Sequence, residues 1–248
     1  MRGKYAIADK TIEICTLGPE THVLCAAYRA EGAADFSVRT DASDIEFERA
    51  HSAREDAREG RDVRPFSDGY LETLAVYRKI AEKMPEYDTV LMHGSCVAVD
   101  GVGYLFTAKS GTGKSTHTRL WREAFGARAV MINDDKPLLR VCASGAVVYG
   151  TPWDGKHRLS TNASAKLRAI CILERAQQNA ISPISAMDAY PMLLQQIYRP
   201  ASAAAMEKTL ALLDMLTLRV DFWRLGCNME IEAAQIAYAA MHGKEEKR

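Results

Sequence analysis

Apolar and polar positions alternate at short range through the first 40 residues of the chain. A period of two is typical of strands that bury one face, and turn residues such as Gly18-Pro19 and Gly32 separate the segments. The pattern predicts four short strands, at residues 5–8, 11–17, 22–28 and 36–39.

The spacing of apolar residues changes after residue 40. Residues 41–65 are dense in charges of both signs, which is typical of a solvated helix or loop. From Phe66 to Met84 the apolar residues recur three or four positions apart, which predicts an amphipathic helix. Together with the strands before them, these segments form a predicted β-rich and helical subdomain, residues 1–85.

Strand-length apolar runs and helical repeats are mixed over the rest of the chain. Asp100-Gly101 separates two apolar runs and predicts a hairpin. The expected strands lie at 89–92, 96–99, 102–106, 128–132, 137–141, 146–149, 167–173 and 219–225, and the expected helices at 118–125, 186–198, 203–217 and 230–241. We therefore expect an α/β (α+β) core at residues 86–242, followed by a charged, flexible tail at 243–248.

Composition narrows the function classes. The chain has 248 residues, 32 basic and 32 acidic, and this balance predicts neither a nucleic-acid partner nor a charged membrane surface. No apolar run approaches the roughly 20 residues that span a bilayer, and the N-terminus lacks a secretory pattern. The six cysteines are scattered and mostly lie in apolar runs, which favours reduced, buried thiols. We expect a cytoplasmic protein.

The run from Ala108 to Thr116, A-K-S-G-T-G-K-S-T, carries the strongest chemical signal. It lies between an expected strand and an expected helix, which is the context of a phosphate-binding loop. Gly111 and Gly113 allow the backbone to curl so that N–H groups surround an anion, and the helix start adds further N–H groups. Lys114 can reach the β/γ-phosphates and the Ser115 hydroxyl can bind Mg²⁺. The predicted nucleotide-binding residues are Ser110, Gly111, Thr112, Gly113, Lys114, Ser115 and Thr116.

Ala108 stands where the common form of this loop has its first glycine. The turn there must tolerate a Cβ, and a chance glycine-rich loop is the alternative interpretation. The coincidence of strand, glycines, lysine, hydroxyls and helix favours phosphate binding.

Three further sites accompany the loop. Asp134-Asp135 ends an apolar strand about twenty residues after Lys114, where one carboxylate can bind Mg²⁺ and the other can accept a proton. His93 also follows a strand, and it is either a proton acceptor, a phosphate contact, a metal ligand or a structural residue. Lys156 and Arg158 lie in a loop after another strand, where they suit a phosphate or an acidic substrate as well as solvent.

The order His93-Gly94, a hairpin, Ser110 to Ser115 and Asp134-Asp135 resembles the catalytic domain of HPr kinase/phosphorylase. It also resembles the nucleotide half of ATP-dependent phosphoenolpyruvate carboxykinase. The resemblance covers roughly residues 90–175 and implies a mixed, largely antiparallel sheet around a P-loop, with residues 1–85 as a small N-terminal β-rich extension.

The resemblance also implies roles for individual residues. His93 and Asp134 would assist deprotonation of the attacking hydroxyl, and Asp135 and Ser115 would bind the metal. Lys114 and the loop amides would hold the nucleotide phosphates. Separately from the resemblance, our kinase hypothesis gives Arg158 the role of offsetting charge on the transferred group. Which of the two aspartates takes which task stays open.

The chain also departs from both families. The chain is much shorter than a carboxykinase and lacks the basic segments upstream, and the glycine-rich acidic segment of HPr kinase is replaced by Thr151–Lys156. These features predict a divergent Mg²⁺- and ATP-dependent kinase whose acceptor is a hydroxyl of a small molecule or of a peptide or protein serine.

Two alternatives stay open. The first is a carboxykinase-like or phosphorolytic enzyme. The second is a nucleotide-binding switch or slow ATPase that docks a protein partner through residues 1–85. The apolar positions Leu210, Leu213 and Leu216 indicate core first and leave a homo-oligomer open.

Overall fold

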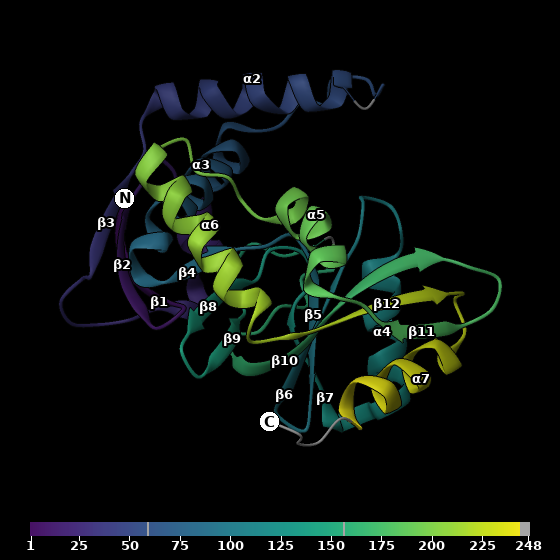
Figure 1. The fold of residues 1–248 in the computed structure, drawn as a ribbon. Helices are drawn as coiled ribbons and strands as arrows, with labels where there is room; N and C mark the ends of the chain where they lie inside the picture. The colour runs from purple at the N-terminus through teal and green to yellow at the C-terminus, as the bar shows by residue number, and fades with distance from the viewer. Residues whose placement is uncertain (59, 156, 244–248) are drawn as a thin grey trace. The chain divides into compact units, whose positions relative to one another are not determined.

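The computed structural model describes residues 1–58, 60–155 and 157–243, and Lys156 and the predicted tail beyond Gly243 lie outside the described residues. The chain forms two compact units, Met1–Lys83 and Met84–Arg248. Figure 1 labels most of the helices and strands of both units.

The N-terminal unit is built on a three-stranded sheet. Strand β1 (Arg2–Ile7) runs antiparallel to β2 (Lys10–Cys15), and β3 (Phe36–Arg39) runs parallel to β2. The helices are α1 (Glu20–Leu24), α2 (Ala42–Arg58) and α3 (Asp68–Lys83). Ile12 and Ile14 of β2 and Leu71 of α3 are fully buried. This is the small β-rich N-terminal part that the sequence predicts.

The strand expected at 22–28 is wrong. The segment forms α1 and a 3₁₀ turn at Ala26–Tyr28, and its buried residues His22, Cys25 and Tyr28 recur at helical spacing. The ring of His22 contacts the Tyr5 hydroxyl through Nδ1 at 2.7 Å and the Thr16 hydroxyl through Nε2 at 2.9 Å. These contacts bury a polar ring in the core. The segment therefore does not follow the pattern of an alternating strand.

Four acidic side chains are buried among the described residues of the N-terminal unit, and each has matched partners. Glu72 accepts hydrogen bonds from the amides of Leu17 at 2.7 Å and Gly18 at 2.9 Å and from the Thr40 hydroxyl at 2.6 Å. The remaining acids accept from cations: Asp44 from Arg78 and Lys79, Glu48 from Arg78, and Asp56 from Arg61 and Arg64. Buried charges paired in this way hold α2 and α3 in place.

The second unit contains one large mixed sheet. Its strands are β4 (Thr89–Leu91), β5 (Ser95–Val99), β6 (Val102–Thr107), β7 (Ala129–Asn133), β8 (Leu138–Cys142), β9 (Gly145–Tyr149), β10 (Ser164–Arg175), β11 (Ala180–Pro183) and β12 (Asp221–Cys227). The order is β4-β8-β9-β10-β6-β5-β7, with β12 beside β10 and β11 beside β12. Only β10 with β6 and β10 with β12 are parallel among the described pairings, so the predicted largely antiparallel sheet is confirmed.

The sheet is curled. Five strand spacings of a flat sheet would separate β8 from β7 by about 24 Å, but only residues 134–137 connect the two strands. That link reaches about 17 Å at full extension. Residues 92–94, which connect β4 to β5 across the same number of spacings, reach only about 14 Å. The two sides of the sheet must therefore approach each other, and we call these two links the short crossings.

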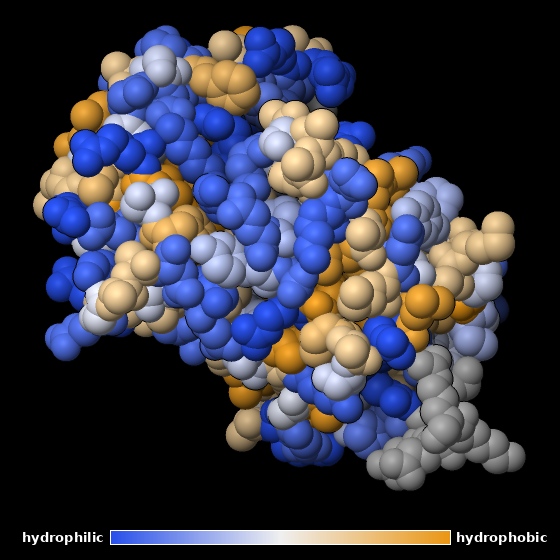
Figure 2. Space-filling view, turned by 60° about the vertical axis from the view of Figure 1, so that its left-hand side comes forward, coloured by the Kyte–Doolittle hydropathy of each residue, from blue (hydrophilic) through white to orange (hydrophobic). Residues whose placement is uncertain are grey.

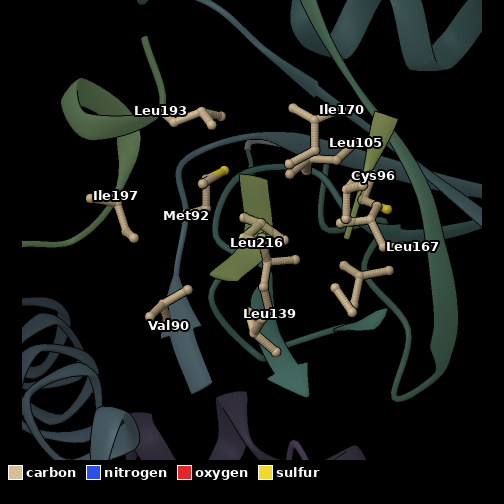
Figure 3. Close-up of a cluster of buried hydrophobic side chains, with 14 of the residues drawn as sticks. Val90, Met92, Cys96, Leu105, Leu139, Leu167, Ile170, Leu193, Ile197 and Leu216 are labelled. Atoms are coloured by element: carbon tan, nitrogen blue, oxygen red, sulfur yellow. The ribbon is translucent and has the colours of Figure 1, made fainter. Parts of the chain in front are cut away.

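Helices cover both faces of this sheet. Alternate residues of β10 point to opposite faces, so Ile170 and Ile172 join one buried cluster and Cys171 and Leu173 join the other. The first cluster includes residues of α5 (Ala186–Gln196) and α6 (Ala203–Thr217), as Figure 3 shows. The second includes residues of α4 (Lys114–Phe125) and α7 (Ile231–His242), which lie side by side in Figure 1.

Burial also decides two expectations from the sequence. Leu213 and Leu216 of α6 are fully buried in the first cluster, so they belong to the core. Strand β11 has no apolar alternation and is mostly exposed, which explains why the sequence pattern does not predict it.

The surface matches the balanced composition. Figure 2 shows hydrophilic and hydrophobic residues interspersed over the face that it presents. Within residues 1–58, 60–155 and 157–243, no helix combines the length and the apolar character needed to cross a membrane.

Candidate active site

The phosphate-binding loop connects the end of β6 to the start of α4. Gly111 has φ 76° and Gly113 has φ 122°, a region that favours glycine. A Cβ added at either position would meet nothing within 4 Å, so backbone conformation rather than space requires these glycines. Ala108 has no positive φ and is fully buried in the second cluster. The missing first glycine therefore causes no strain at that position.

The start of α4 presents unpaired donors. The amide of His117 is the first to find a helical acceptor, donating to Gly113 O at 2.9 Å. To the other described residues, the amides of Lys114, Ser115 and Thr116 donate no hydrogen bond. Free amides and the positive end of the helix dipole together favour an anion such as a phosphate.

The backbone of the loop accepts hydrogen bonds from two cationic side chains, Lys114 and Arg175. Lys114 is 9% exposed and donates from Nζ to Ala108 O at 3.2 Å, so its ammonium is folded over the loop. Burial lowers the pKa of Lys114, and the charges of Asp135 and Asp134 act in the opposite direction. Arg175, at the end of β10, donates to Gly111 O at 2.5 Å and to Thr112 O at 3.3 Å. The sequence analysis missed Arg175, which holds the apex of the loop.

Asp134 is connected to the loop helix through hydroxyl groups. Its Oδ1 accepts a hydrogen bond from Ser95 Oγ at 2.7 Å, and Ser95 Oγ lies 2.9 Å from Thr118 Oγ1 on α4. The Thr118 hydroxyl also lies 3.3 Å from the carbonyl oxygens of Lys114 and Ser115, so it joins Ser95 to the first turn of α4. Asp134 is 4% exposed and forms no ion pair with any other described residue. The sequence holds no local signal for Ser95 or Thr118, since their contact with Asp134 depends on the fold.

Asp135, the neighbouring carboxylate, contacts His93. His93 Nε2 lies 3.2 Å from Asp135 Oδ1, and Lys136 Nζ lies 3.5 Å from Asp135 Oδ2. Burial alone would raise the pKa of Asp135, but the bond from His93 and the charge of Lys136 outweigh it, so the pKa is below its ordinary value. The two short crossings therefore meet at this pair, and the amide of Gly94 also donates to Asp135 O at 3.0 Å.

Asn133 organises the surroundings of both carboxylates. It is fully buried, and its Oδ1 accepts from the amides of Asp135 at 2.9 Å and Lys136 at 2.5 Å. Its Nδ2 donates to Thr151 O at 3.2 Å and to Trp153 O at 3.3 Å. One side chain thus fixes the Asp-Asp turn and the loop after β9. Asparagine before a turn is a recognisable sequence signal, and the sequence analysis did not use it.

The loop after β9 reaches Asp134 at Gly155. A Cβ added to Gly155 would lie 2.9 Å from Asp134 Oδ2, so the backbone at residue 155 approaches that oxygen too closely to carry a side chain without a shift. Arg158 is exposed with φ 48°, and its side chain makes no hydrogen bond or ion pair with the described residues. Of the predicted site residues, the structure brings His93 into contact with Asp135 and leaves Arg158 apart.

The donor set suits a hard cation that uses few protein ligands. Among the described residues, no group of three or more His, Cys, Asp or Glu side chains could hold a metal ion. Mg²⁺ does not need such a group, because one or two carboxylates together with substrate phosphates commonly bind it. The exposed Ser115 hydroxyl and the Asp135 carboxylate are oxygen donors of the required kind.

No family model matches the chain, and no curated protein matches it significantly. Among solved structures, the chain is similar to the HPr(Ser) kinase/phosphatase from Coxiella burnetii, with 9% sequence identity and a TM-score of 0.36 over 62% of this chain and 95% of that one.

Proposed function

We propose that this protein is a Mg²⁺-dependent kinase that transfers the γ-phosphoryl group of ATP to a hydroxyl of a small molecule or of a peptide or protein serine. The observation that carries the proposal is the hydroxyl chain from Thr118 on the phosphate-loop helix through Ser95 to the buried Asp134. It ties a phosphate-binding loop to a carboxylate that has no cation partner among the described residues.

The loop would bind the nucleotide. The free amides at the start of α4 and the Lys114 ammonium would hold the phosphates once Lys114 leaves Ala108 O. Mg²⁺, bound by Ser115 and Asp135 together with phosphate oxygens, would neutralise charge on the transferred group. Arg175 would keep the glycine turn in its binding conformation through the carbonyls of Gly111 and Thr112.

Asp134 is our candidate for the general base. Its Oδ1 is occupied by Ser95, whereas Oδ2 accepts no hydrogen bond from the described residues and is closely approached by Gly155. An acceptor hydroxyl that reaches Oδ2 could donate its proton there as its oxygen attacks the γ-phosphorus and ADP leaves. His93 contacts Asp135. It would therefore help to orient the acceptor from a position next to that carboxylate.

A labelling experiment tests the proposal. Wild-type protein, Lys114→Ala and the control Lys166→Ala, which removes an exposed lysine from β10, would be incubated with γ-³²P-ATP, Mg²⁺ and fractionated pools of metabolites, peptides and proteins. We expect a labelled product with wild type and the control that is lost with Lys114→Ala. Its size separates a metabolite from a polypeptide acceptor.

Other outcomes identify the alternatives. ATP binding that depends on Lys114 without any labelled acceptor would overturn the kinase proposal in favour of a slow ATPase or switch. Nucleotide turnover that requires carbon dioxide or inorganic phosphate would favour a carboxykinase-like or phosphorolytic enzyme.

A further inference from the structure

The loop after β9 is fastened to the end of β7 on both of its sides. Asn133 holds the outgoing side through two backbone carbonyls. On the returning side, the Thr161 amide donates to Ile132 O at 3.2 Å and the Thr161 hydroxyl donates to Met131 O at 2.8 Å. A Cβ on Gly150 would collide with Thr161 O, so the two sides touch at their base. The exposed tip of the loop therefore projects from a base that is held in place.

Arg158 lies in this tip, next to the residue that approaches the candidate base. Its amide donates to Gly155 O at 3.1 Å, and a hydrogen bond of that span brings the two Cα atoms within about 7 Å of each other. Gly155 in turn closely approaches Asp134 Oδ2. The Arg158 side chain therefore starts close to the place where an acceptor hydroxyl would lose its proton.

The backbone of Arg158 has an uncommon conformation. Its φ is 48°, in the left-handed region that few residues other than glycine adopt. The other described non-glycine residues with positive φ have short side chains: Ala8, Asp9, Asp88 and Asp100. A long side chain in this conformation costs free energy and persists only where the surrounding structure holds it, and such residues are concentrated at ligand-binding sites. The conformation therefore favours a functional role for Arg158.

The Arg158 guanidinium has no partner in the part of the chain that the structure describes. The side chain is exposed and makes no hydrogen bond or ion pair with the described residues. Asp154, in the same loop, accepts a hydrogen bond from the Ser160 amide at 3.2 Å and does not pair with Arg158. A planar guanidinium binds a carboxylate or a phosphate through two parallel hydrogen bonds. Arg158 therefore suits an anionic ligand.

We propose that the acceptor is an anionic hydroxyl compound, and that Arg158 binds its carboxylate or phosphate group while its hydroxyl faces Asp134. The hydroxyl oxygen forms the new bond to the γ-phosphorus, ADP leaves with the electrons of the broken bond, and the hydroxyl proton passes to Asp134 Oδ2. The role as acceptor rests on the proposed kinase function, whereas anion binding by Arg158 is a property of the protein alone.

This assignment differs from the role that the sequence suggests for Arg158. The cations that bond to the phosphate loop are Lys114 and Arg175. The amide of Arg158 instead bonds to Gly155, whose backbone approaches the oxygen that would take the acceptor proton. Arg158 therefore serves the acceptor rather than the transferred phosphoryl group.

Arginine modification tests anion binding without any transfer. Metabolites, freed of nucleotides on charcoal, and tryptic peptides are each separated on an anion-exchange resin at neutral pH into a bound, anionic pool and an unbound pool. Phenylglyoxal then modifies exposed guanidinium groups of Lys114→Ala, whose phosphate loop lacks its lysine. Mass spectrometry compares Arg158 with Arg219 in the same molecules. Arg219 precedes β12, is exposed, and its side chain has no partner among the described residues.

The ratio of the two modification rates gives the result. We expect the bound pool to slow the modification of Arg158 several-fold more than that of Arg219, and the unbound pool to leave the ratio unchanged. The metabolite and peptide arms show which source supplies the anion. An unchanged ratio with both bound pools, or equal protection by an unbound pool, would overturn the proposal.

Transfer kinetics then connect the anion site with the reaction. Label from γ-³²P-ATP should enter a compound of the bound pool. Arg158→Asn removes the guanidinium, and asparagine tolerates a positive φ. It should raise the KM for the purified acceptor about 10- to 100-fold, the effect of losing hydrogen bonds to a charged group, with the KM for ATP unchanged. Arg158→Lys keeps the charge without the parallel pair of donors and should lie in between.

The outcomes separate this inference from the proposed function. Protection of Arg158 by a bound pool in a protein that transfers no phosphoryl group would support the anion site and refute the kinase. Label in a compound of the unbound pool would support the kinase and overturn the anionic acceptor. An unchanged acceptor KM in Arg158→Asn, or an equal increase in the control Arg219→Asn, would overturn the role of Arg158.

Discussion

The two units bury acidic side chains in opposite ways. In the N-terminal unit Glu72 accepts three hydrogen bonds, and Asp56 accepts from two arginines. In the second unit Asp134 is almost as buried but accepts one hydrogen bond, from Ser95, and forms no ion pair with the described residues. An acid with all its partners stabilises a fold, whereas a partly satisfied one keeps the capacity to accept a proton.

The location of the partly satisfied acid follows from the sheet. The short crossings at residues 92–94 and 134–137 join opposite sides of a curled sheet, and they carry His93, Asp134 and Asp135. Buried strands have their backbone groups paired in ladders, whereas the crossing residues turn their polar groups toward each other. In the N-terminal unit the paired acids instead lie on α2 and α3, and two of them, Asp44 and Glu48, connect these helices.

The sharpest test of this contrast is Asp134→Asn. The amide keeps the volume and the acceptor for Ser95, so we expect an unchanged melting temperature and unchanged nucleotide binding, measured by calorimetry. It cannot take up the acceptor proton, so phosphoryl transfer should fall about 10²- to 10⁴-fold, the range of general-base catalysis. Wild-type turnover by this variant would eliminate Asp134 as the base.

Gly155→Ala tests the space beside Asp134 rather than its charge. The new Cβ would lie 2.9 Å from Oδ2, so the carboxylate or the loop must move. A displacement of a few tenths of an ångström should lower kcat on the order of 10-fold, because misplacement of reacting groups is costly. Gly226→Ala on β12 is the control, since its Cβ would contact Ala176 Cβ at 3.1 Å and no residue of the site. Equal kcat values for the two variants would show that the position of Asp134 Oδ2 does not affect turnover.

Local pattern predicts much of the fold. The hairpin at Asp100-Gly101 and the helix after the phosphate loop follow from turn residues and spacing, and both are confirmed. The alternating strand expected at 22–28 is wrong because a polar ring, His22, is buried there by distant partners. The sequence does not predict strand β11, because its residues do not alternate between apolar and polar.

The site is harder to predict because its contacts join distant residues. The glycines and Lys114 are readable because a phosphate loop is one continuous segment. Ser95 and Thr118 have no chemistry of their own to attract notice, and they matter only through what the curled sheet places beside them. The roles of Asp134 and Asp135 likewise depend on their partners, which are Ser95 on β5 and His93 on the other short crossing.

The converse prediction concerns the N-terminal unit. Glu72→Gln replaces one acceptor oxygen by an NH₂ group, which then faces either the Gly18 amide or the donors at Leu17 and Thr40. We expect the free energy of unfolding of this unit to fall by about 1–3 kcal/mol, the cost of unsatisfied buried groups, in urea titrations followed by circular dichroism. Phosphoryl transfer per folded molecule should not change.

Glu55→Gln is the matched control for Glu72→Gln. The side chain of Glu55 is 60% exposed, so its substitution should change stability by less than about 0.5 kcal/mol. Loss of transfer activity in fully folded Glu72→Gln would contradict the division between structural and functional acids.

The smallest effect that we predict is a pH dependence from Asp56. Hydrogen bonds from the Arg64 side chain and amide, and from Arg61, lower the pKa of this buried carboxyl from 3.8 to about 2. A lowered folded-state pKa means that the stabilisation is complete above the unfolded value and is lost as the pH falls from about 4 to about 2. The urea midpoint of the N-terminal unit should therefore decrease over that window in wild type.

Asp56→Asn isolates this contribution from those of the other carboxyl groups. The variant should be less stable at pH 7, because Arg61 and Arg64 lose their anionic partner, and its midpoint should decrease less between pH 4 and pH 2. The difference between the two proteins should therefore shrink as the pH falls. A difference in urea midpoint that stays constant from pH 4 to pH 2 would mean that the arginines do not hold Asp56 ionised. Asp56 could then no longer serve as the paired acid with which Asp134 is compared.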